Sequence, residues 1–305
     1  MWSRLVLGVL LLWAVPAYAR QLQYNAERVG ASVAFQYVWQ DRAGTAHTVA
    51  FQLPESALKV AQINFQGFDV EKAKAAAQQS LQAYASKPRA DVRLRVNGST
   101  ISAEGVNKAS LEREMALAKD HYKKALEDEL YKAYFTRVDE NSIMPDHTRI
   151  AQMNYAAVRP IAQALAPKMA QMTARERVNF LLGFVQSIPY DTLDSRNNGA
   201  GFVTPLQLIA ANRGDCDSKS VLFVALLRHF YPNLRALMVY VPGHAFVGLD
   251  VPRDGTDFAL QLGSLVAVLA EPVGPGLTAL GQIRPESIQV IRQGQVSYRE
   301  FDFLR

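Results

Sequence analysis

The chain of 305 residues contains one cysteine, Cys216, and this limits how its fold can be stabilised. A single thiol cannot close a disulfide within the chain, so no internal cross-link is available. The roles that remain are inert packing, an intermolecular disulfide, metal ligation and nucleophilic chemistry. The residues around the cysteine decide among them.

The first 19 residues have the pattern of a secretory signal. Arg4 precedes the apolar run Leu5–Val15, and small residues follow at Ala17 and Ala19. The run is shorter than the roughly 20 apolar residues that span a bilayer. We therefore expect cleavage after Ala19 and a secreted or periplasmic protein, without stable membrane insertion after cleavage. An uncleaved anchor is the alternative.

The charge pattern argues against a nucleic-acid partner. The formal net charge is +5, and basic residues are interleaved with acidic ones. No basic stripe with spaced aromatic residues is present, so we expect no nucleic-acid binding. The one cysteine and five histidines show no zinc-ligand spacing, and no glycine-rich phosphate loop follows a strand. We expect neither a metal nor a cofactor.

Residues 20–145 are expected to form a mixed α/β region with hairpins and a long helix. Ala31–Trp39 and His47–Leu53 have strand character on either side of a turn. Asn97–Gly98 is a strong hairpin signal. Ser110–Val138 has an apolar face at helical spacing. Nothing in this region indicates chemistry, and its expected role is to dock substrate or a protein partner, or to cover a cleft.

A second unit is expected over residues 146–283, followed by a tail at 284–305. Thr173 and Glu176 form a capping-box pattern that predicts the start of a helix. This helix should end before Pro189, because the residue that precedes a proline disfavours the α conformation.

Cys216 is predicted to lie in the first turn of the next helix, with Asp215 as its N-cap. The backbone N–H groups and the helix dipole favour a thiolate there, whereas the charges of Asp215 and Asp217 oppose it. Ionisation therefore depends on a cationic partner. The polar residues Asp217, Ser218 and Lys219 predict an accessible position rather than a core one, which favours the nucleophile.

His244 is the expected partner of the thiol. Leu234–Val241 reads as a strand, Pro242–Gly243 as a turn, and His244 begins the following strand. An antiparallel sheet packed on the Cys216 helix would bring this imidazole to the start of the helix. A histidine close to the sulfur would supply the cationic partner that the thiolate needs.

Glu271 is the expected acidic partner of His244. It follows a third apolar strand, Ser264–Ala270, which we place beside the strand of His244. An acid there would orient the imidazole and stabilise its cation. Asp257 and Asp250 are competing candidates for this role.

These motifs together resemble the transglutaminase-like superfamily, and in particular its bacterial cysteine-peptidase-like branch. The order is Gly-Asp-Cys-Asp around Cys216, then Gly-His-Ala-Phe-Val-Gly around His244, then Glu-Pro-Val-Gly-Pro-Gly from Glu271. The similar stretch covers roughly residues 175–280. Many relatives instead use an aspartate after a strand that contains tryptophan, and this chain has no tryptophan there.

The resemblance implies an α+β, papain-like domain in which the nucleophile helix packs on an antiparallel sheet. Cys216 would attack an amide or ester as a thiolate held by His244, His244 would later protonate the leaving amine, and Glu271 would orient His244. Gln186 is the expected oxyanion donor beside the Cys216 N–H, and a surface glutamine at the helix end is the alternative. The implied enzyme is a cysteine hydrolase, a peptidase or amidase.

Its expected substrate is a peptide, a protein or a wall peptide. Hydrolysis is preferred over cross-linking, since nothing in the sequence indicates a site for an acceptor amine. The competing hypothesis is a non-catalytic module that binds a peptide or an assembly partner at the same cleft.

Overall fold

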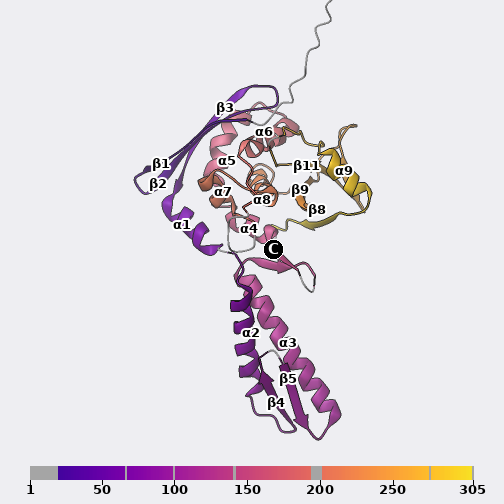
Figure 1. Cartoon of the computed structure of the whole chain (residues 1–305). Coiled ribbons are helices and arrows are strands. Elements are labelled where there is room, and N and C mark those ends of the chain that lie inside the picture. The colour runs from indigo at the N-terminus through magenta and orange to yellow at the C-terminus, as the bar shows by residue number, and fades with distance from the viewer. Residues whose placement is uncertain are drawn as a thin grey trace, which may run out of the picture.

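The computed structural model describes residues 20–303 apart from 66, 99, 140, 141, 194–200 and 275. The expected signal peptide, residues 1–19, lies outside the described residues. Figure 1 shows a body of helices and sheets from which a long arm extends. Within the described residues, no helix is long and apolar enough to cross a membrane.

A three-stranded antiparallel sheet opens the described chain. Its strands are β1 (Arg20–Val29), β2 (Ser32–Gln40) and β3 (Ala46–Pro54), in that order. The predicted hairpin is confirmed as β2 and β3, whereas β1 was not predicted. Alternate residues of β2 are buried against α6, where the Trp39 and Phe184 rings lie 5.3 Å apart. Residues on both sides of the expected boundary at 145/146 therefore share one core.

The arm has a small core of its own. Helix α1 (Glu55–Asn64) precedes the arm in the chain. The arm consists of α2 (Val70–Ala85), β4 (Val92–Asn97), β5 (Thr100–Gly105) and α3 (Lys108–Lys132). The buried cluster of this core is formed by Leu81, Val92, Leu94 and Ala118. The predicted turn joins β4 to β5, with Gly98 at a φ of 60°. The long helix ends at Lys132 rather than Val138, because Tyr134 adopts a φ of 62° and the chain turns into a short hairpin.

That hairpin, β6 (Phe135–Arg137) and β7 (Ile143–Pro145), leads into the helices of the body. These are α4 (His147–Asn154), α5 (Arg159–Leu165), a 3₁₀ turn (Ala166–Met169), α6 (Ala174–Ser187), α7 (Pro205–Ala211) and α8 (Cys216–Leu227). The capping box predicted at Thr173 and Glu176 is present at the start of α6. Helix α8 is buried along almost its whole length, which explains why it is apolar on all sides.

A five-stranded antiparallel sheet completes the body. Its strands are β8 (Ala236–Val241), β9 (His244–Leu249), β10 (Ala259–Leu262), β11 (Leu265–Ala270) and β12 (Ser297–Glu300). Their order in space is β10-β11-β9-β8-β12. Apolar residues on one face of this sheet join the α8 core, and those on the other pack against α9 (Pro285–Arg292). The described part of the segment after residue 283 thus supplies a helix and an edge strand, and the predicted α+β class is confirmed.

Candidate active site

The loop before Cys216 is held in place by the chain that leaves α6. The Gly214 N–H donates to the Pro189 carbonyl over 3.2 Å, and the Asp191 N–H donates to the Gly214 carbonyl over 3.1 Å. A Cβ atom on Gly214 would lie 2.6 Å from a Leu208 methyl carbon, so this close approach requires glycine. The two hydrogen bonds of Gly214 fix the position at which α8 begins.

Cys216 is the first residue of α8, and it is partly exposed. Asp215 caps the helix as predicted, accepting a hydrogen bond from the Ser218 N–H over 3.2 Å. The helix that carries the thiol packs against β9, and the Ala245 N–H is close enough to the sulfur to lower the pKa of the thiol. Among the described residues, the Cys216 N–H makes no backbone hydrogen bond.

His244 begins β9 after a turn in which Gly243 has a φ of 72°. Its Nε2 lies 2.5 Å from Oε1 of Glu271. A carboxylate can only accept, so Nε2 carries the proton in this contact and Nδ1 is the nitrogen that can accept one. The structure therefore brings His244 and Glu271 together, and it places Cys216 beside the residue that follows His244.

Glu271 is fully buried, and three donors surround its carboxylate. Besides His244, the Arg284 N–H donates to Oε2 over 3.0 Å, and Arg284 Nε lies 3.3 Å from Oε1. A buried carboxylate needs such partners, because the charge is otherwise too costly to bury. Arg284 was not predicted as part of the site, and no local motif in the sequence distinguishes it.

The competing acids do not contact His244. Asp257 is buried and accepts hydrogen bonds from Arg175 and from the Asp254 N–H, over 2.5 Å and 2.8 Å. Asp250 is exposed. Of the three acids considered, only Glu271 contacts the imidazole.

Gln186 has a different environment from the expected one. Its side-chain nitrogen donates to the backbone carbonyls of Glu271 and Thr278, each over 2.9 Å, and lies 3.1 Å from the Thr278 hydroxyl. The side chain is buried rather than exposed at the helix end. Since both of its N–H bonds are used, Gln186 is not available as an oxyanion donor, and it instead fixes the segment that carries Glu271.

The thiol is not ionised at rest. Burial, followed by the charges of Asp217 and Asp215, raises the pKa of Cys216 to about 12, although the Ala245 and Asp217 N–H groups oppose this. The sequence predicted a thiolate kept charged by His244, and the raised pKa differs from this expectation because burial and the two acidic neighbours outweigh the helix start. Any nucleophilic chemistry at this thiol therefore requires a base that removes its proton.

A second histidine supports the loop of the cysteine. His147, which is buried, lies with Nε2 2.9 Å from Asp217 and with Nδ1 2.8 Å from the Tyr240 hydroxyl. Burial opposes the charge of Asp217, yet the hydrogen bond and the attraction of His147 hold the pKa of Asp217 below its usual value. Burial and the Asp217 charge raise the pKa of Asp215, so the two neighbouring carboxyls are shifted in opposite directions.

Lys219 is fully buried, in contrast to the exposure that its polar neighbours predicted. Its Nζ donates to the carbonyls of Ile188 and Gln186, over 2.6 Å and 3.3 Å, and so satisfies the C-terminal end of α6. Burial, with a contribution from the charge of Arg284, lowers the pKa of Lys219 to about 7. Lys219, in the first turn of α8, therefore links this helix to the end of α6 in the interior.

The pKa of Lys219 predicts a pH-dependent stability. The folded-state pKa of about 7 lies below the ordinary 10.5, so the unfolded chain binds more protons between these values. The Lys219 contribution to the free energy of unfolding should then rise with pH across this window, by up to about 1.4 kcal/mol per pH unit. Lys219→Met removes this slope. Urea unfolding of both proteins at several pH values tests it, and a wild-type-to-variant difference that does not change with pH would contradict it.

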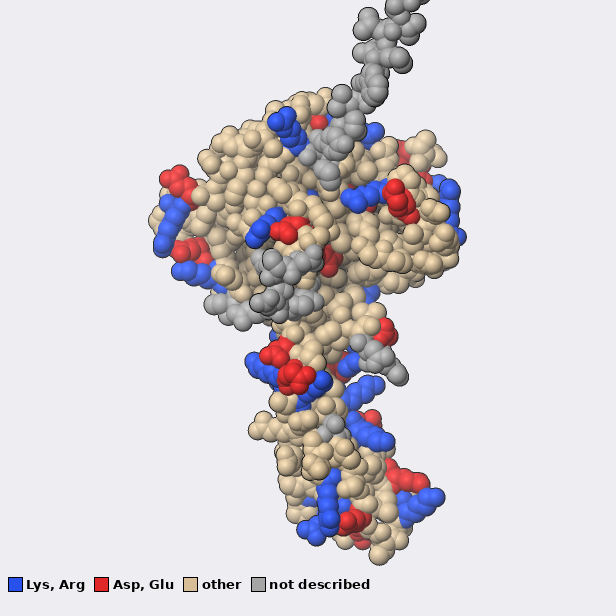
Figure 2. Space-filling model, viewed as in Figure 1, with Lys and Arg blue, Asp and Glu red and all other residues tan. Residues whose placement is uncertain are grey.

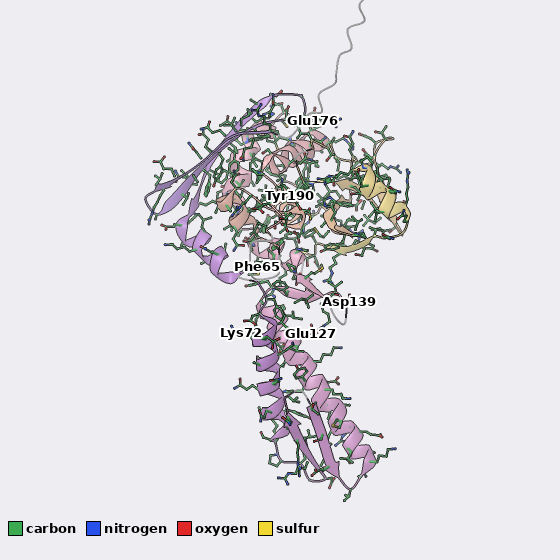
Figure 3. All side chains as sticks on the ribbon, viewed as in Figure 1. Phe65, Lys72, Glu127, Asp139, Glu176 and Tyr190 are labelled. Atoms are coloured by element: carbon green, nitrogen blue, oxygen red, sulfur yellow. The ribbon has the colours of Figure 1, made fainter. Side chains whose placement is uncertain are left out.

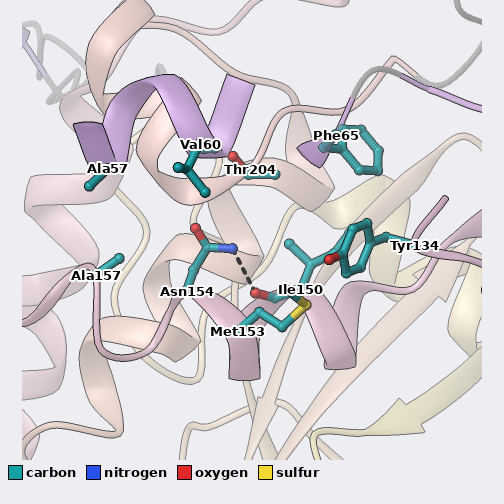
Figure 4. Close-up of a pocket in the computed structure, with 10 residues that line it drawn as sticks. Ala57, Val60, Phe65, Tyr134, Ile150, Met153, Asn154, Ala157 and Thr204 are labelled. Carbon is teal, nitrogen blue, oxygen red and sulfur yellow. Dashed lines mark hydrogen bonds between the residues drawn. The ribbon is translucent and has the colours of Figure 1, made fainter. Parts of the chain in front are cut away.

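Two of the pockets differ in the residues that line them. One, of about 420 Å³, is lined by His244, Tyr190 and Arg284. Figure 3 shows Tyr190 over the middle of the body, away from the arm. The other, of about 150 Å³, is mostly apolar and lies between α1 and α4, where Asn154 donates to the Ile150 carbonyl (Figure 4). It contains none of the candidate site residues.

The described residues hold no group of three or more His, Cys, Asp or Glu side chains that could bind a metal ion. The face in Figure 2 carries acidic and basic side chains side by side rather than in a single-sign stripe. No family model, curated protein or solved structure matches the chain, so its activity has to be inferred from the site.

Proposed function

We propose that the protein is an exported, transglutaminase-like cysteine hydrolase that cleaves an amide bond in a peptide or protein. The observation that carries this proposal is the contact between His244 Nε2 and the fully buried Glu271, at the start of the strand against which the Cys216 helix packs. The pair supplies the base and the orienting acid that a catalytic triad with Cys216 would need.

The architecture also supports this assignment. The candidate nucleophile begins a buried helix, α8, which packs against β9 of an antiparallel sheet. The base begins β9 and the acid follows the neighbouring strand, β11. This is the order of elements that the resemblance to the transglutaminase-like superfamily implies.

The proposed reaction begins with proton transfer. His244 Nδ1 takes the proton of the Cys216 thiol as the sulfur attacks the carbonyl carbon, and Glu271 stabilises the resulting imidazolium. His244 then gives this proton to the leaving nitrogen as the C–N bond breaks, which leaves a thioester on Cys216. Water attacks the thioester with His244 again as the base, releasing the acid and restoring the thiol.

The developing oxyanion needs hydrogen-bond donors. The Cys216 N–H is free among the described backbone groups, as noted above. The Tyr190 hydroxyl is a second donor, in place of Gln186. Tyr190 lines the pocket beside His244, and burial raises the pKa of Tyr190, so the hydroxyl keeps its proton.

The proposed location is outside the cytoplasm, on the evidence of residues 1–19. A peptide, a protein or a wall peptide is the proposed substrate. A protein partner for residues 20–145 stays a prediction, and the arm in Figure 1 is the part of this region that extends furthest from the site.

One observation favours the alternative of a non-catalytic binding module. The pKa of about 12 keeps the thiol protonated, and a protonated thiol is a poor nucleophile. In that case the same pocket would hold a peptide without cleaving it. The two functions differ in whether His244 increases the reactivity of the sulfur.

The Cys216→Ala variant tests the enzymatic proposal. The side chain is small and only partly buried, so the variant should keep the circular dichroism spectrum and melting temperature of the wild type. Cleavage of a library of internally quenched peptides should fall to background, because no other group can form the thioester. Wild-type activity that survives in Cys216→Ala would refute the assigned nucleophile.

A further inference from the structure

The pocket beside His244 has donors that the proposed reaction does not use. It lies between the Pro242–Gly243 turn, the segment at Val273–Gly274 and the start of α9. Arg284 and Ser287 line it from the α9 side, and Tyr190 lines it from the chain that leaves α6. The imidazole that would act on the scissile bond thus shares one cavity with a guanidinium group.

Arg284 has most of its donors free. Only its Nε is engaged by a side chain, at 3.3 Å from Glu271, and the side chain is 43% exposed. A guanidinium has five N–H donors in a planar fork that matches a carboxylate. The two terminal nitrogens have no hydrogen-bond partner among the described residues, and they are therefore available to a ligand in the pocket.

Ser287 is a second and independent indication of a ligand. It is only 5% exposed, it lines the pocket, and its hydroxyl has no hydrogen-bond partner among the residues that the structure describes. Its oxygen is not among the buried side-chain atoms that lack a partner, so the hydroxyl is accessible and can bond to a ligand in the pocket. The first turn of α9 is also uncapped, since Arg284 at the N-cap position makes no side-chain cap. Its N–H groups and dipole favour an anion.

We propose that this pocket binds a carboxylate of the substrate, close to the bond that Cys216 attacks, through Arg284, Ser287 and the start of α9. The inference rests on the proposed function for its orientation toward Cys216. Among the residues that line the pocket, only Glu286 carries a negative charge that would repel a carboxylate, and its side chain is exposed. The carboxylate belongs either to a free peptide C-terminus or to an acidic side chain.

Protection of the thiol tests this inference without any substrate. Cys216 is the only cysteine, so its alkylation by iodoacetamide can be followed on the intact protein by mass spectrometry. Three small compounds serve as probes: N-acetylglycine with a free α-carboxylate, N-acetylglutamic acid α-amide with a side-chain carboxylate, and uncharged N-acetylglycinamide. At least one carboxylate should slow alkylation, and the uncharged compound should not. The stronger of the two protecting compounds identifies the source of the carboxylate.

Matched variants separate the subsite from a general charge effect. Arg284→Gln should weaken protection by about tenfold or more, because a charge-assisted hydrogen bond is lost. Ser287→Ala leaves the Glu271 contacts intact and should weaken protection severalfold, so the test holds even if Arg284→Gln folds poorly. Glu286→Gln should strengthen protection or leave it unchanged, because it removes the opposing charge.

Equal protection by all three compounds would overturn the inference, as would carboxylate protection that survives both Arg284→Gln and Ser287→Ala. The proposed function fails separately. If carboxylates protect the thiol but the thiol of His244→Ala is alkylated as fast as that of the wild type, the carboxylate subsite is supported and the proposed hydrolase function is refuted. If His244 activates the thiol but no carboxylate protects it from alkylation, the proposed hydrolase function is supported and the carboxylate subsite is refuted.

Discussion

Replacing His244 with alanine is expected to slow peptide hydrolysis by about 10²–10⁴-fold, the range over which a positioned general base contributes. The physical reason is the pKa of about 12 at Cys216, which leaves almost no thiolate at neutral pH unless a base takes the proton. Alkylation of the thiol by iodoacetamide should slow in the same variant. Steady-state hydrolysis and alkylation rates, compared with those of the wild type, measure both effects.

His121→Ala is a matched control for this change. His121 lies on α3 in the arm, where its ring contacts the Ser80 hydroxyl, so its loss should leave both rates unchanged. Equal alkylation rates in the wild type and His244→Ala would show that the imidazole does not act on the sulfur. That result would favour the non-catalytic binding module.

Replacing Glu271 with alanine is expected to lower the free energy of unfolding by about 1–3 kcal/mol, as happens when buried donors lose their hydrogen-bond acceptor. The change leaves the Arg284 N–H and His244 Nε2 without the buried carboxylate that both of them contact. Hydrolysis should fall as well, because the imidazole loses the group that fixes which nitrogen carries the proton. Urea unfolding measures the first effect, and kcat on the quenched peptides measures the second.

Two further variants sharpen this test. Glu271→Gln keeps the size of the side chain and one acceptor oxygen, so it should recover part of the stability but little of the activity. Glu300→Ala breaks the exposed pair with Arg235 and should cost less than about 1 kcal/mol. A Glu271→Ala protein as stable as Glu300→Ala would contradict the account of a buried, charge-paired carboxylate.

The sequence predicted those parts of the fold that depend on short-range patterns. The hairpin at Asn97–Gly98, the capping box at Thr173 and the cap at Asp215 each involve residues within a few positions of one another. The placement of His244 at the start of a strand was also predictable, because the Pro242–Gly243 turn marks it. These features depend on local backbone geometry, which a few neighbouring residues decide.

The rest depended on contacts between distant parts of the chain. Lys219 looked exposed among polar neighbours, but it is buried, and the carbonyls at the end of α6 accept hydrogen bonds from it. Gln186 looked free to donate, but Thr278 and the Glu271 carbonyl use both of its N–H bonds. Arg284 has no local pattern that links it to Glu271, and only the packing of α9 on the sheet brings the two together.

The acyl-enzyme is the most direct test of the central claim, that Cys216 is a nucleophile activated by His244. The protein would be mixed with p-nitrophenyl acetate and the modified peptide identified by mass spectrometry. We predict an acetyl thioester on Cys216 that forms faster in the native protein than in the urea-unfolded chain, and more slowly in His244→Ala. Acetylation of lysines alone, or a thioester that forms no faster in the folded protein than in the unfolded one, would contradict the account.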